Sequence, residues 1–227
     1  APVRRYEAAF RTQEMRFMAS KLLLFMGMKH CGKTTLGRRL ASEWGLPFFD
    51  LDDVIVALYR KESGIPKQDL SIRDVYRKTG KAGFQRLEAA GAEYIISNKA
   101  TPDVPVHRTG VHRTGTEEPL KGALIGICAL GGGTIENSAA MEHFSIYGYF
   151  CYIREERDLL YRRIISRGMP AFLNPTDPES DFSMLYAHRT RRFEELADVT
   201  IDGMGRNRED LYRALKKKLK ETVYGRK

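Results

Sequence analysis

The chain has 227 residues, a formal net charge of +9 and 42% hydrophobic residues, which suits one α/β domain with a substantial core better than two small domains. Its apolar runs are too short to cross a bilayer and no signal-peptide layout is visible, so we expect a cytoplasmic protein without a membrane partner. The positive residues are scattered along the chain, which argues against a nucleic-acid surface. The three cysteines have no framework spacing, and this favours reduced thiols.

The first predicted strand and helix enclose a phosphate-binding motif. We expect residues 1–17, which precede Met18, to be an appended extension that takes no part in the chemistry. The expected catalytic domain is therefore 18–227. The apolar run Leu22–Met26 predicts a buried strand, and Thr35–Trp44 has the apolar spacing of a helix. Between them stands Gly27-Met28-Lys29-His30-Cys31-Gly32-Lys33-Thr34, a G-x-x-x-x-G-K-T phosphate loop.

The residue types of this loop suit a nucleoside triphosphate with a metal ion. Gly27 and Gly32 let backbone amides face a polyphosphate at a helix N-terminus, where the helix dipole favours negative charge. Lys33 is predicted to neutralise the β and γ oxygens, and Thr34 to offer its hydroxyl to Mg²⁺. Further backbone contacts to phosphate are expected from Lys29, Cys31 and Thr35. We therefore expect ATP and Mg²⁺ as cofactors, and we interpret the Cys31 thiol as incidental.

A second short strand brings carboxylates to the same edge of the sheet. Leu46–Phe49 predicts that strand, and Asp50 and Asp52 follow at its C-terminal end, where the sites of α/β proteins gather. Because they stand one residue apart on a segment expected to be extended, they should face opposite sides and could do different jobs. Alternatively one of them caps the next helix, a role that Asp53 fits better, at the start of a helix over Val54–Arg60.

The middle of the chain predicts two more helices. One spans Ser71–Thr79, with Ser71 as its N-cap and Gly80 as its stop, and the next spans Gly83–Ser97. A polar insertion follows at Asn98–Lys121, where a tandem pentapeptide indicates a mobile loop.

Two histidines of this insertion, His107 and His112, could in principle hold a metal ion. No cysteine, aspartate or glutamate stands nearby at ligand spacing, so a solvated loop is the favoured interpretation.

The remaining elements continue the alternation of strand and helix. Ala123–Leu130 predicts a buried strand that ends in Gly131-Gly132-Gly133, which either lets a ligand lie against the bare backbone or is a plain flexible turn. The elements expected after it are a strand at Tyr147–Ile153, a helix at Glu155–Ser166, a loop to Phe182, a helix to Ala197, a strand at Val199–Ile201 and a final helix. Five strands with helical crossovers predict an α/β fold.

Five motifs in this order resemble the shikimate kinase family. They are the phosphate loop, Phe49-Asp50-Leu51-Asp52, the Gly80…Phe84-x-x-x-Glu88 spacing, Leu130-Gly131-Gly132-Gly133, and Arg189…Phe193-Glu194-Glu195-Leu196-Ala197-Asp198. The resemblance spans residues 21–219 apart from the insertion. It implies a three-layer P-loop kinase fold of the nucleoside-monophosphate-kinase type, with helices on both faces of a five-stranded parallel sheet in the order 2-3-1-4-5. It also implies a mobile lid at residues 167–182 and phosphorylation of the 3-hydroxyl of shikimate by MgATP.

The same resemblance implies roles for single residues. Asp52 would accept hydrogen bonds from the acceptor and help to remove the attacking proton, and Asp50 would hold Mg²⁺ directly or through water. The glycine turn at 131–133 would lie against the acceptor, and Arg189 would bind its carboxylate, the alternative being an exposed helical arginine. The residues that resemble an adenine sandwich, or are simply surface charges, are Arg162, Arg206 and Asn207.

Two positions depart from the family pattern. Gln85 stands where the family has an arginine that clamps the acceptor carboxylate, and Met169 stands where the lid carries a catalytic arginine. Losing such a lid cation can cost on the order of 10³-fold in rate. Arg86 lies about 100° round the helix from Gln85 and should not inherit its pocket, whereas Arg167 is the candidate for the lid cation.

Three functions remain open on these grounds. The first is a shikimate kinase, with Lys33, Asp52 and Arg167 as catalytic residues and Gln85 as an altered acceptor contact. The second is a kinase of the same fold that acts on another small hydroxylated molecule, and the third is a nucleotide-binding module without catalysis. We rank them in that order because most of the catalytic apparatus is present, and we expect a monomer.

Overall fold

The fold is described from a computed structural model for residues 21–65, 70–97, 124–170 and 173–224. Those residues carry a five-stranded sheet with the strand order β2-β3-β1-β4-β5. The strands are β1 (Lys21–Met26), β2 (Phe48–Asp50), β3 (Leu124–Ala129), β4 (Gly148–Arg154) and β5 (Val199–Asp202). Every neighbouring pair is parallel, so the predicted order and direction are confirmed. The interpretations of residues 1–17 and of the insertion with His107 and His112 concern residues outside this description.

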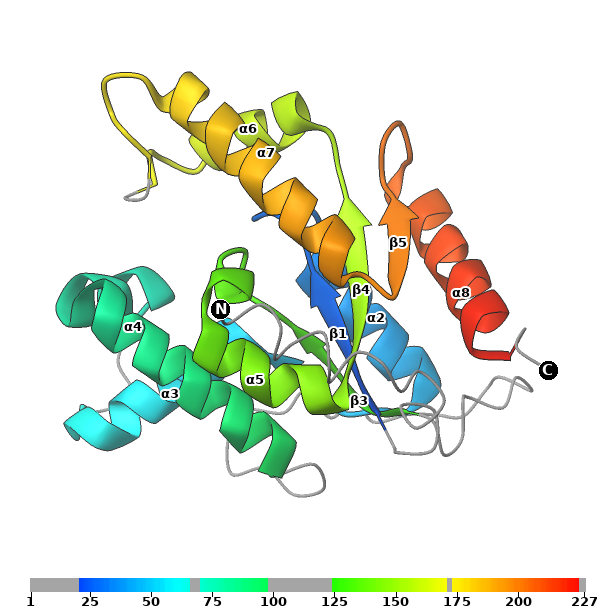
Figure 1. Ribbon diagram of the computed structural model, residues 1–227, viewed down its shortest axis with the longest axis horizontal. Helices are drawn as coiled ribbons and strands as arrows, with labels where there is room; N and C mark the ends of the chain where they lie inside the picture. The colour runs from blue at the N-terminus through cyan, green and yellow to red at the C-terminus, as the bar shows by residue number, and fades with distance from the viewer. Residues whose placement is uncertain (1–20, 66–69, 98–123, 171–172, 225–227) are drawn as a thin grey trace, which may run out of the picture.

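Helices cover both faces of the sheet (Figure 1). On one side lie α2 (Lys33–Trp44) and α8 (Arg208–Tyr224), and on the other lie α4 (Ile72–Ser97) and α5 (Ser138–Tyr147). Helix α3 (Leu51–Ser63) packs against α4. Helix α6 (Arg157–Ile165) lies beyond the carboxyl end of β4, and α7 (Pro178–Leu196) runs from there to the side of β4, where Phe193 stacks on Tyr152. The predicted three-layer α/β arrangement is confirmed.

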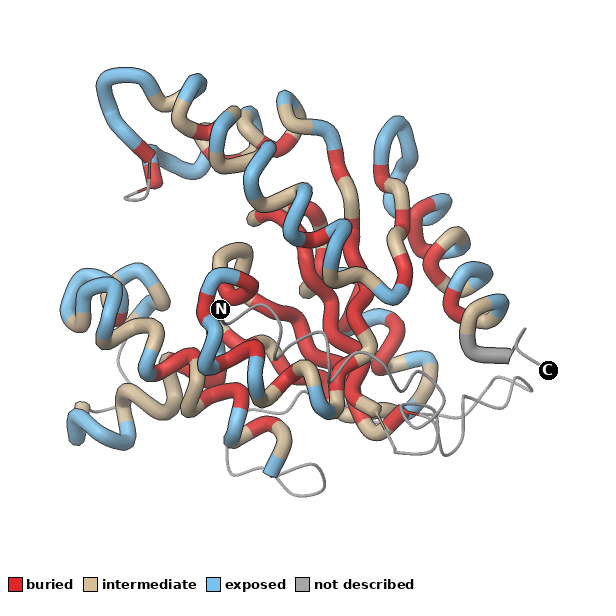
Figure 2. The backbone as a smooth tube through the Cα atoms, in the orientation of Figure 1, coloured by how far each residue is buried: buried red, intermediate tan, exposed pale blue. Residues whose placement is uncertain are grey.

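The burial of the sheet explains why its strands have continuous apolar sequences. Residues 23–26 of β1 are fully buried, and Figure 2 shows the same continuous burial along the central strands. A parallel sheet with helices on both faces buries both sides of each strand, so polar residues do not alternate with apolar ones. Cys128 and Cys151 lie in this core as free thiols, as their apolar surroundings in the sequence predicted.

The start of α3 differs from the prediction. The helix begins at Leu51 rather than near Val54, and its N-cap is Asp50 rather than Asp53. The Asp50 carboxylate accepts a hydrogen bond from the Asp52 amide at 3.1 Å, which satisfies an amide that the helix itself leaves without a partner. Asp52 therefore lies in the first turn of a helix, and the prediction of an extended segment through both carboxylates is wrong.

Helix α7 also begins earlier than predicted. The sequence interpretation placed a loop up to Phe182, whereas the helix starts at Pro178. The Asp177 carboxylate caps it by accepting a hydrogen bond from the Ser180 amide at 3.2 Å, and proline is well suited to the first helical position. The last part of the predicted lid, residues 178–182, is therefore helical.

Helix α5 had no counterpart among the predicted elements. Asn137 is its N-cap, with a side-chain oxygen that accepts a hydrogen bond from the Ala140 amide at 3.3 Å. The sequence signal for this helix was an asparagine followed by good helix formers. The helix begins shortly after the glycine turn, with residues 134–136 between them.

The two helical patterns predicted around Gly80 are both present. Ser71 and Asp74 exchange side-chain and backbone hydrogen bonds at the start of α4, which confirms Ser71 as the cap. Gly80 has φ 66° and ψ −177°, a non-helical conformation that interrupts α4 where the sequence predicted a stop. Positive φ strains residues with a Cβ atom, so glycine is the residue that suits this kink.

Candidate functional site

The phosphate loop connects β1 to α2 and folds around its own lysine. The Lys33 ammonium donates hydrogen bonds to the carbonyl oxygens of Gly27 at 2.8 Å and Met28 at 2.9 Å. Gly27 has φ 146°, and a Cβ there would lie 2.7 Å from the Ile153 carbonyl oxygen, so a side chain does not fit. The loop therefore has the compact backbone that lets amides approach a phosphate, with a buried cation at its centre.

Thr34 and Asp50, the two predicted magnesium ligands, are in direct contact. The Thr34 hydroxyl donates to Asp50 Oδ2 at 2.8 Å. The second oxygen of the same carboxylate caps α3, which fixes its orientation. Hydroxyl and carboxylate oxygens are the donors that Mg²⁺ prefers, and this ion usually keeps further positions for phosphate and water. The residues present therefore fit a magnesium ion beside the phosphate loop.

Asp52 is a half-buried carboxylate in the first turn of α3. Burial, and then the charge of Asp50, raise its pKa to about 6, although Lys33 and Lys29 oppose the shift. A carboxylate with a pKa near the working pH can accept a proton during a reaction. Its environment is therefore that of a candidate base.

The glycine turn after β3 is the point where the other parts of the site meet. A Cβ at Gly131 would lie 3.5 Å from Asp52 Oδ1, one at Gly132 would lie 3.3 Å from the Lys29 amide nitrogen, and one at Gly133 would lie 3.0 Å from Arg189 Nη2. The turn thus lies against the candidate base, the phosphate loop and α7 at once. The interpretation as a plain flexible turn does not account for three such approaches.

A buried carboxylate network fixes α4 to this turn. Glu88 accepts hydrogen bonds from the Thr134 hydroxyl at 2.7 Å and from Asn137 Nδ2 at 3.0 Å. Asn137 Nδ2 also donates to the Gln85 carbonyl oxygen at 2.8 Å. Burial raises the pKa of Glu88, although the hydrogen bonds from Asn137 and Thr134 oppose the shift. The sequence indicated only the spacing of Glu88, and its partners lie too far along the chain for a pattern to reveal them.

Arg189 extends from α7 to the same turn. Its side chain is 15% exposed. The guanidinium donates to both carboxylate oxygens of Glu136, from Nε at 2.8 Å and from Nη2 at 3.1 Å. The interpretation of Arg189 as an exposed helical arginine is therefore wrong, and Glu136 is a contact that the sequence did not predict.

Gln85 and Met169 stand where the family has arginines, and Arg86 and Arg167 are the neighbouring arginines that could replace those charges. Gln85 of α4 is half-buried, and its carbonyl oxygen accepts a hydrogen bond from the Asn137 side chain. Arg86 is exposed and pairs with Glu62 of α3 at 3.4 Å, so it points away from the glycine turn, as expected. Met169 is exposed, while the exposed Arg167 acts electrostatically on Lys29 and His30 of the phosphate loop.

Several positive charges surround the phosphate loop. Burial, and then the charge of Arg73, lower the pKa of Lys29. Burial, and then Arg167, lower the pKa of His30 to about 4, so this imidazole is neutral at pH 7. Arg73 stands in the first turn of α4 and had no predicted role, because its nearness to the loop arises from the packing of distant segments. The surroundings are suited to polyanionic phosphate.

Arg163 of α6 is a second loop contact that the sequence did not predict. It donates to the His30 carbonyl oxygen at 3.1 Å and pairs with the buried Glu155 at 3.3 Å. His30 has φ 66° without being a glycine, so the loop holds it in a strained conformation. Arg163 stabilises that conformation through the carbonyl group.

The predicted adenine contacts have structural partners of their own. The Arg162 Nε donates to the Asp158 carbonyl oxygen at 3.3 Å. The Asn207 side chain accepts hydrogen bonds from the amides of Glu209 and Asp210 at the start of α8. Both residues and Arg206 are exposed, so they are accessible, and the interpretation as surface residues stays open beside the adenine role.

The described residues contain no group of three or more His, Cys, Asp or Glu side chains that could hold a metal ion. A magnesium ion at Thr34 and Asp50 would thus take most of its ligands from phosphate and water. Among the helices that the structure describes, none is both long and apolar enough to cross a membrane.

The chain is similar to known kinases over most of its length. The family model for shikimate kinase matches residues 29–104 and 120–220. A shikimate kinase of Thiobacillus denitrificans is 29% identical over 180 residues, which are 79% of this chain and 80% of that protein. A shikimate kinase of Chlamydia pneumoniae is 28% identical over 176 residues, which are 78% of this chain and 82% of that protein.

A solved structure of shikimate kinase from Acinetobacter baumannii in complex with shikimate has the same fold. It superposes with a TM-score of 0.65 at 22% identity and covers 93% of this chain and 98% of that chain. The phosphate loop, the acidic edge and the glycine turn lie within the residues that the family model spans or directly before them. The chain belongs to the shikimate kinase family of small-molecule kinases.

Proposed function

We propose that this protein transfers the γ-phosphoryl group of MgATP to the 3-hydroxyl of shikimate. The observation that carries the proposal is the position of Asp52. It lies beside the glycine turn at Gly131, and its pKa responds to Lys33 and Lys29 of the phosphate loop. A carboxylate between a phosphate site and an acceptor site is where a transferred group and its attacking hydroxyl would meet.

The phosphate loop would bind the triphosphate. Its backbone amides, including those of Lys29, Cys31 and Thr35, would face the phosphate oxygens, and Lys33 would exchange its carbonyl partners for the β and γ oxygens. Thr34 and Asp50 would hold Mg²⁺, which supplies charge neutralisation between the β and γ phosphates when bound.

Asp52 would act on the acceptor. Its carboxylate would accept the proton of the attacking hydroxyl while that oxygen forms a bond to the γ phosphorus and the bond to the β-γ bridging oxygen breaks. ADP and the phosphorylated acceptor are the products. A pKa of about 6 is low enough for Asp52 to be ionised at neutral pH, and it is high enough for the carboxylate to hold a proton during the reaction.

The glycine turn, Gln85 and Arg189 would form the acceptor side. The turn at 131–133 offers bare backbone, and the guanidinium of Arg189 lies against Gly133, where it would bind the acceptor carboxylate. The curated relatives that carry the name shikimate kinase support this acceptor.

The remaining parts of the proposal concern closure and the adenine base. Residues 167–182 would act as a lid that excludes water, with Arg167 supplying a cation to the transferring phosphoryl group. The exposed residues Arg162, Arg206 and Asn207 would contact adenine. Residues 18–227 would form the catalytic domain.

A coupled assay that follows ADP release tests the function directly. With MgATP and shikimate we expect turnover well above the ATPase background, and formation of shikimate 3-phosphate by mass spectrometry. The Asp52→Asn variant should bind MgATP as the wild type does and lose turnover. Turnover of both proteins at the ATPase background alone would reject the proposal.

A second candidate is a kinase for a different small hydroxylated molecule. Gln85 favours it, because an amide replaces the charged clamp of the family at a half-buried position. A panel of polyols and sugar acids would show turnover that exceeds the turnover of shikimate. A protein that binds ATP and phosphorylates no member of the panel would instead be a nucleotide-binding module.

A further inference from the structure

Arg189 is already bound by a carboxylate of the chain itself. Glu136 ends the short 3-10 helix η2 (Thr134–Glu136) that follows the glycine turn. Its two oxygens accept hydrogen bonds from Arg189 Nε at 2.8 Å and Nη2 at 3.1 Å. Two parallel N–H···O bonds are the arrangement in which arginine binds a free carboxylate. Glu136 therefore occupies the same donors that an acidic acceptor would need.

Arg189 is the dominant positive partner of Glu136, and His188 and Lys81 make smaller contributions. His188 Nδ1 lies 3.7 Å from Glu136 Oε1. Partial burial opposes ionisation of Glu136, but the hydrogen bonds and charge of Arg189 outweigh it and hold the pKa of Glu136 below its usual value. Glu88 is close enough to interact with both Glu136 and Arg189. Gln85, which lies three residues before Glu88 in α4, is uncharged. A second carboxylate placed beside Arg189 would thus meet a cation that is largely neutralised.

We propose that Glu136 sets the charge selectivity of the acceptor site. It binds Arg189 in the ligand-free protein, so an acidic acceptor must displace it, whereas a neutral acceptor of the same shape need not. This inference rests on the proposed function, since it treats the glycine turn and Arg189 as the acceptor site.

A merely positioning role for Glu136 leads to the opposite expectation. If Glu136 only held Arg189 in place, removing its charge would loosen the guanidinium and weaken the binding of an acid. If Glu136 competes with the acceptor, removing its charge strengthens that binding. The sign of the change therefore separates the two roles.

The test compares Glu136→Gln with the wild type by calorimetry in the presence of MgADP. Glutamine keeps the shape of the side chain and removes its charge. The probes are shikimate and its methyl ester, which differ in the charge of one group. We expect shikimate to bind about threefold to tenfold more tightly to the variant, a range suited to a partly solvated arginine–carboxylate pair. Binding of the ester should change by less than about twofold on the same grounds.

The steady-state assay supplies a second readout. KM for shikimate should fall with the dissociation constant, while kcat and KM for MgATP stay near the wild-type values. Glu142→Gln is the matched control, because it makes the same charge change at an exposed position of α5. That control should leave the ratio of acid to ester affinity unchanged.

The possible outcomes separate this inference from the proposed function. An unchanged or reduced shikimate affinity in Glu136→Gln, with wild-type turnover intact, overturns the role of Glu136 and leaves the kinase function standing. Shikimate binding that is gained only by the variant supports the role of Glu136 and rejects shikimate as the wild-type acceptor. Absence of shikimate binding to both proteins overturns both proposals.

Discussion

At the scale of single residues, Asp52 combines two requirements that oppose each other. In the proposed reaction it must lose solvent to lie beside the acceptor, and it must still ionise to accept a proton. Burial and the charge of Asp50 raise its pKa to about 6, while two lysines of the phosphate loop prevent a larger shift. The balance leaves a carboxylate that is mostly charged at neutral pH and is a stronger base than an exposed aspartate.

This balance predicts an acid limb in the pH profile of the reaction. The kcat/KM for the acceptor should fall about tenfold per pH unit below about 6, because the protonated carboxyl can no longer accept the hydroxyl proton. ATP itself titrates in a similar range, so MgATP affinity must be measured over the same pH values. A profile that stays flat down to about pH 5 would contradict the role of Asp52.

Asp52→Asn should lower the activity and raise the free energy of unfolding. A carboxyl group with a raised pKa in the folded state binds its proton more tightly there, so its contribution to stability is present at low pH and is lost as pH rises through about 6. Asparagine avoids that loss, and near pH 8 we expect the free energy of unfolding to rise by on the order of 1 kcal/mol. Catalysis should fall by roughly 10²- to 10⁴-fold. Urea unfolding near pH 8 and pH 5 checks the first effect, which should shrink at the lower pH.

At the scale of elements, the site depends on how α4 is held against the glycine turn. The link is the buried Glu88 with its donors Thr134 and Asn137, which come from the segment between β3 and α5. Hydrogen bonds to a buried charged group are costly to remove, because the remaining charge is left without a partner. The same network holds the Gln85 backbone near the turn.

Thr134→Val should therefore loosen this connection. Valine keeps the volume of threonine and removes the hydroxyl, so Glu88 loses a hydrogen bond of 2.7 Å and we expect a loss of about 1–3 kcal/mol in the free energy of unfolding. Thr200→Val in β5 makes the same chemical change away from the network and should alter stability by less than about 0.5 kcal/mol. Equal effects in the two variants would show that the network does not stabilise the fold.

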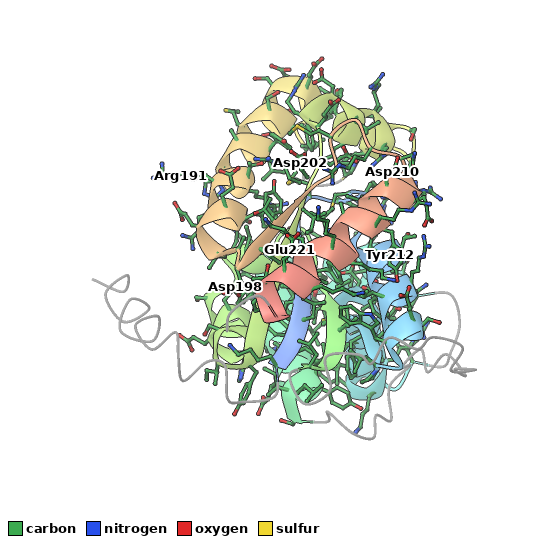
Figure 3. All side chains as sticks on the ribbon, turned by 90° about the vertical axis from the view of Figure 1, so that its right-hand side faces the viewer. Arg191, Asp198, Asp202, Asp210, Tyr212 and Glu221 are labelled. Atoms are coloured by element: carbon green, nitrogen blue, oxygen red, sulfur yellow. The ribbon has the colours of Figure 1, made fainter. Side chains whose placement is uncertain are left out.

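At the scale of the whole molecule, α8 packs against the last strand, β5, and also contacts α2, the helix that follows the phosphate loop. Figure 3 shows Tyr212 of α8 beside α2. Its hydroxyl donates to Glu43 Oε2 at 2.5 Å, and the Arg39 guanidinium lies 3.8 Å from the centre of its ring. Lys216 also pairs with Glu43. These contacts tie α8 to the end of α2 that lies away from the loop.

Tyr212→Phe should lower stability and leave catalysis unchanged. The phenyl ring keeps its packing and its contact with Arg39, while Glu43 loses one donor and retains Lys216. We expect a loss of about 1 kcal/mol in the free energy of unfolding, with kcat and both KM values close to those of the wild type. Tyr76→Phe, at an exposed position of α4, is the control and should have a smaller effect. A large change in KM for MgATP would show that α8 influences the loop through α2.

Local patterns were sufficient for much of the architecture. The apolar runs of the five strands, the glycine-rich phosphate loop and the cap at Ser71 are short-range signals, and all appear where the sequence predicted them. The errors are the starts of α3 and α7 and the whole of α5, which the sequence did not predict. Asp50 and Asp53 are equally good caps by residue type, so the sequence could not distinguish them. In the structure Asp50 is the cap, and its other carboxylate oxygen accepts a hydrogen bond from Thr34.

The sequence by itself determined the family and the fold, and it predicted the phosphate-binding and acidic residues, because these depend on spacing within short segments. Tertiary structure alone decided which side chains meet. Glu136 and Arg189 are 53 positions apart, and Thr134 and Glu88 are 46 apart, so no local pattern links them. The charge of the proposed acceptor site depends on such pairs, since burial and neighbouring charges set both the ionisation and the availability of each group.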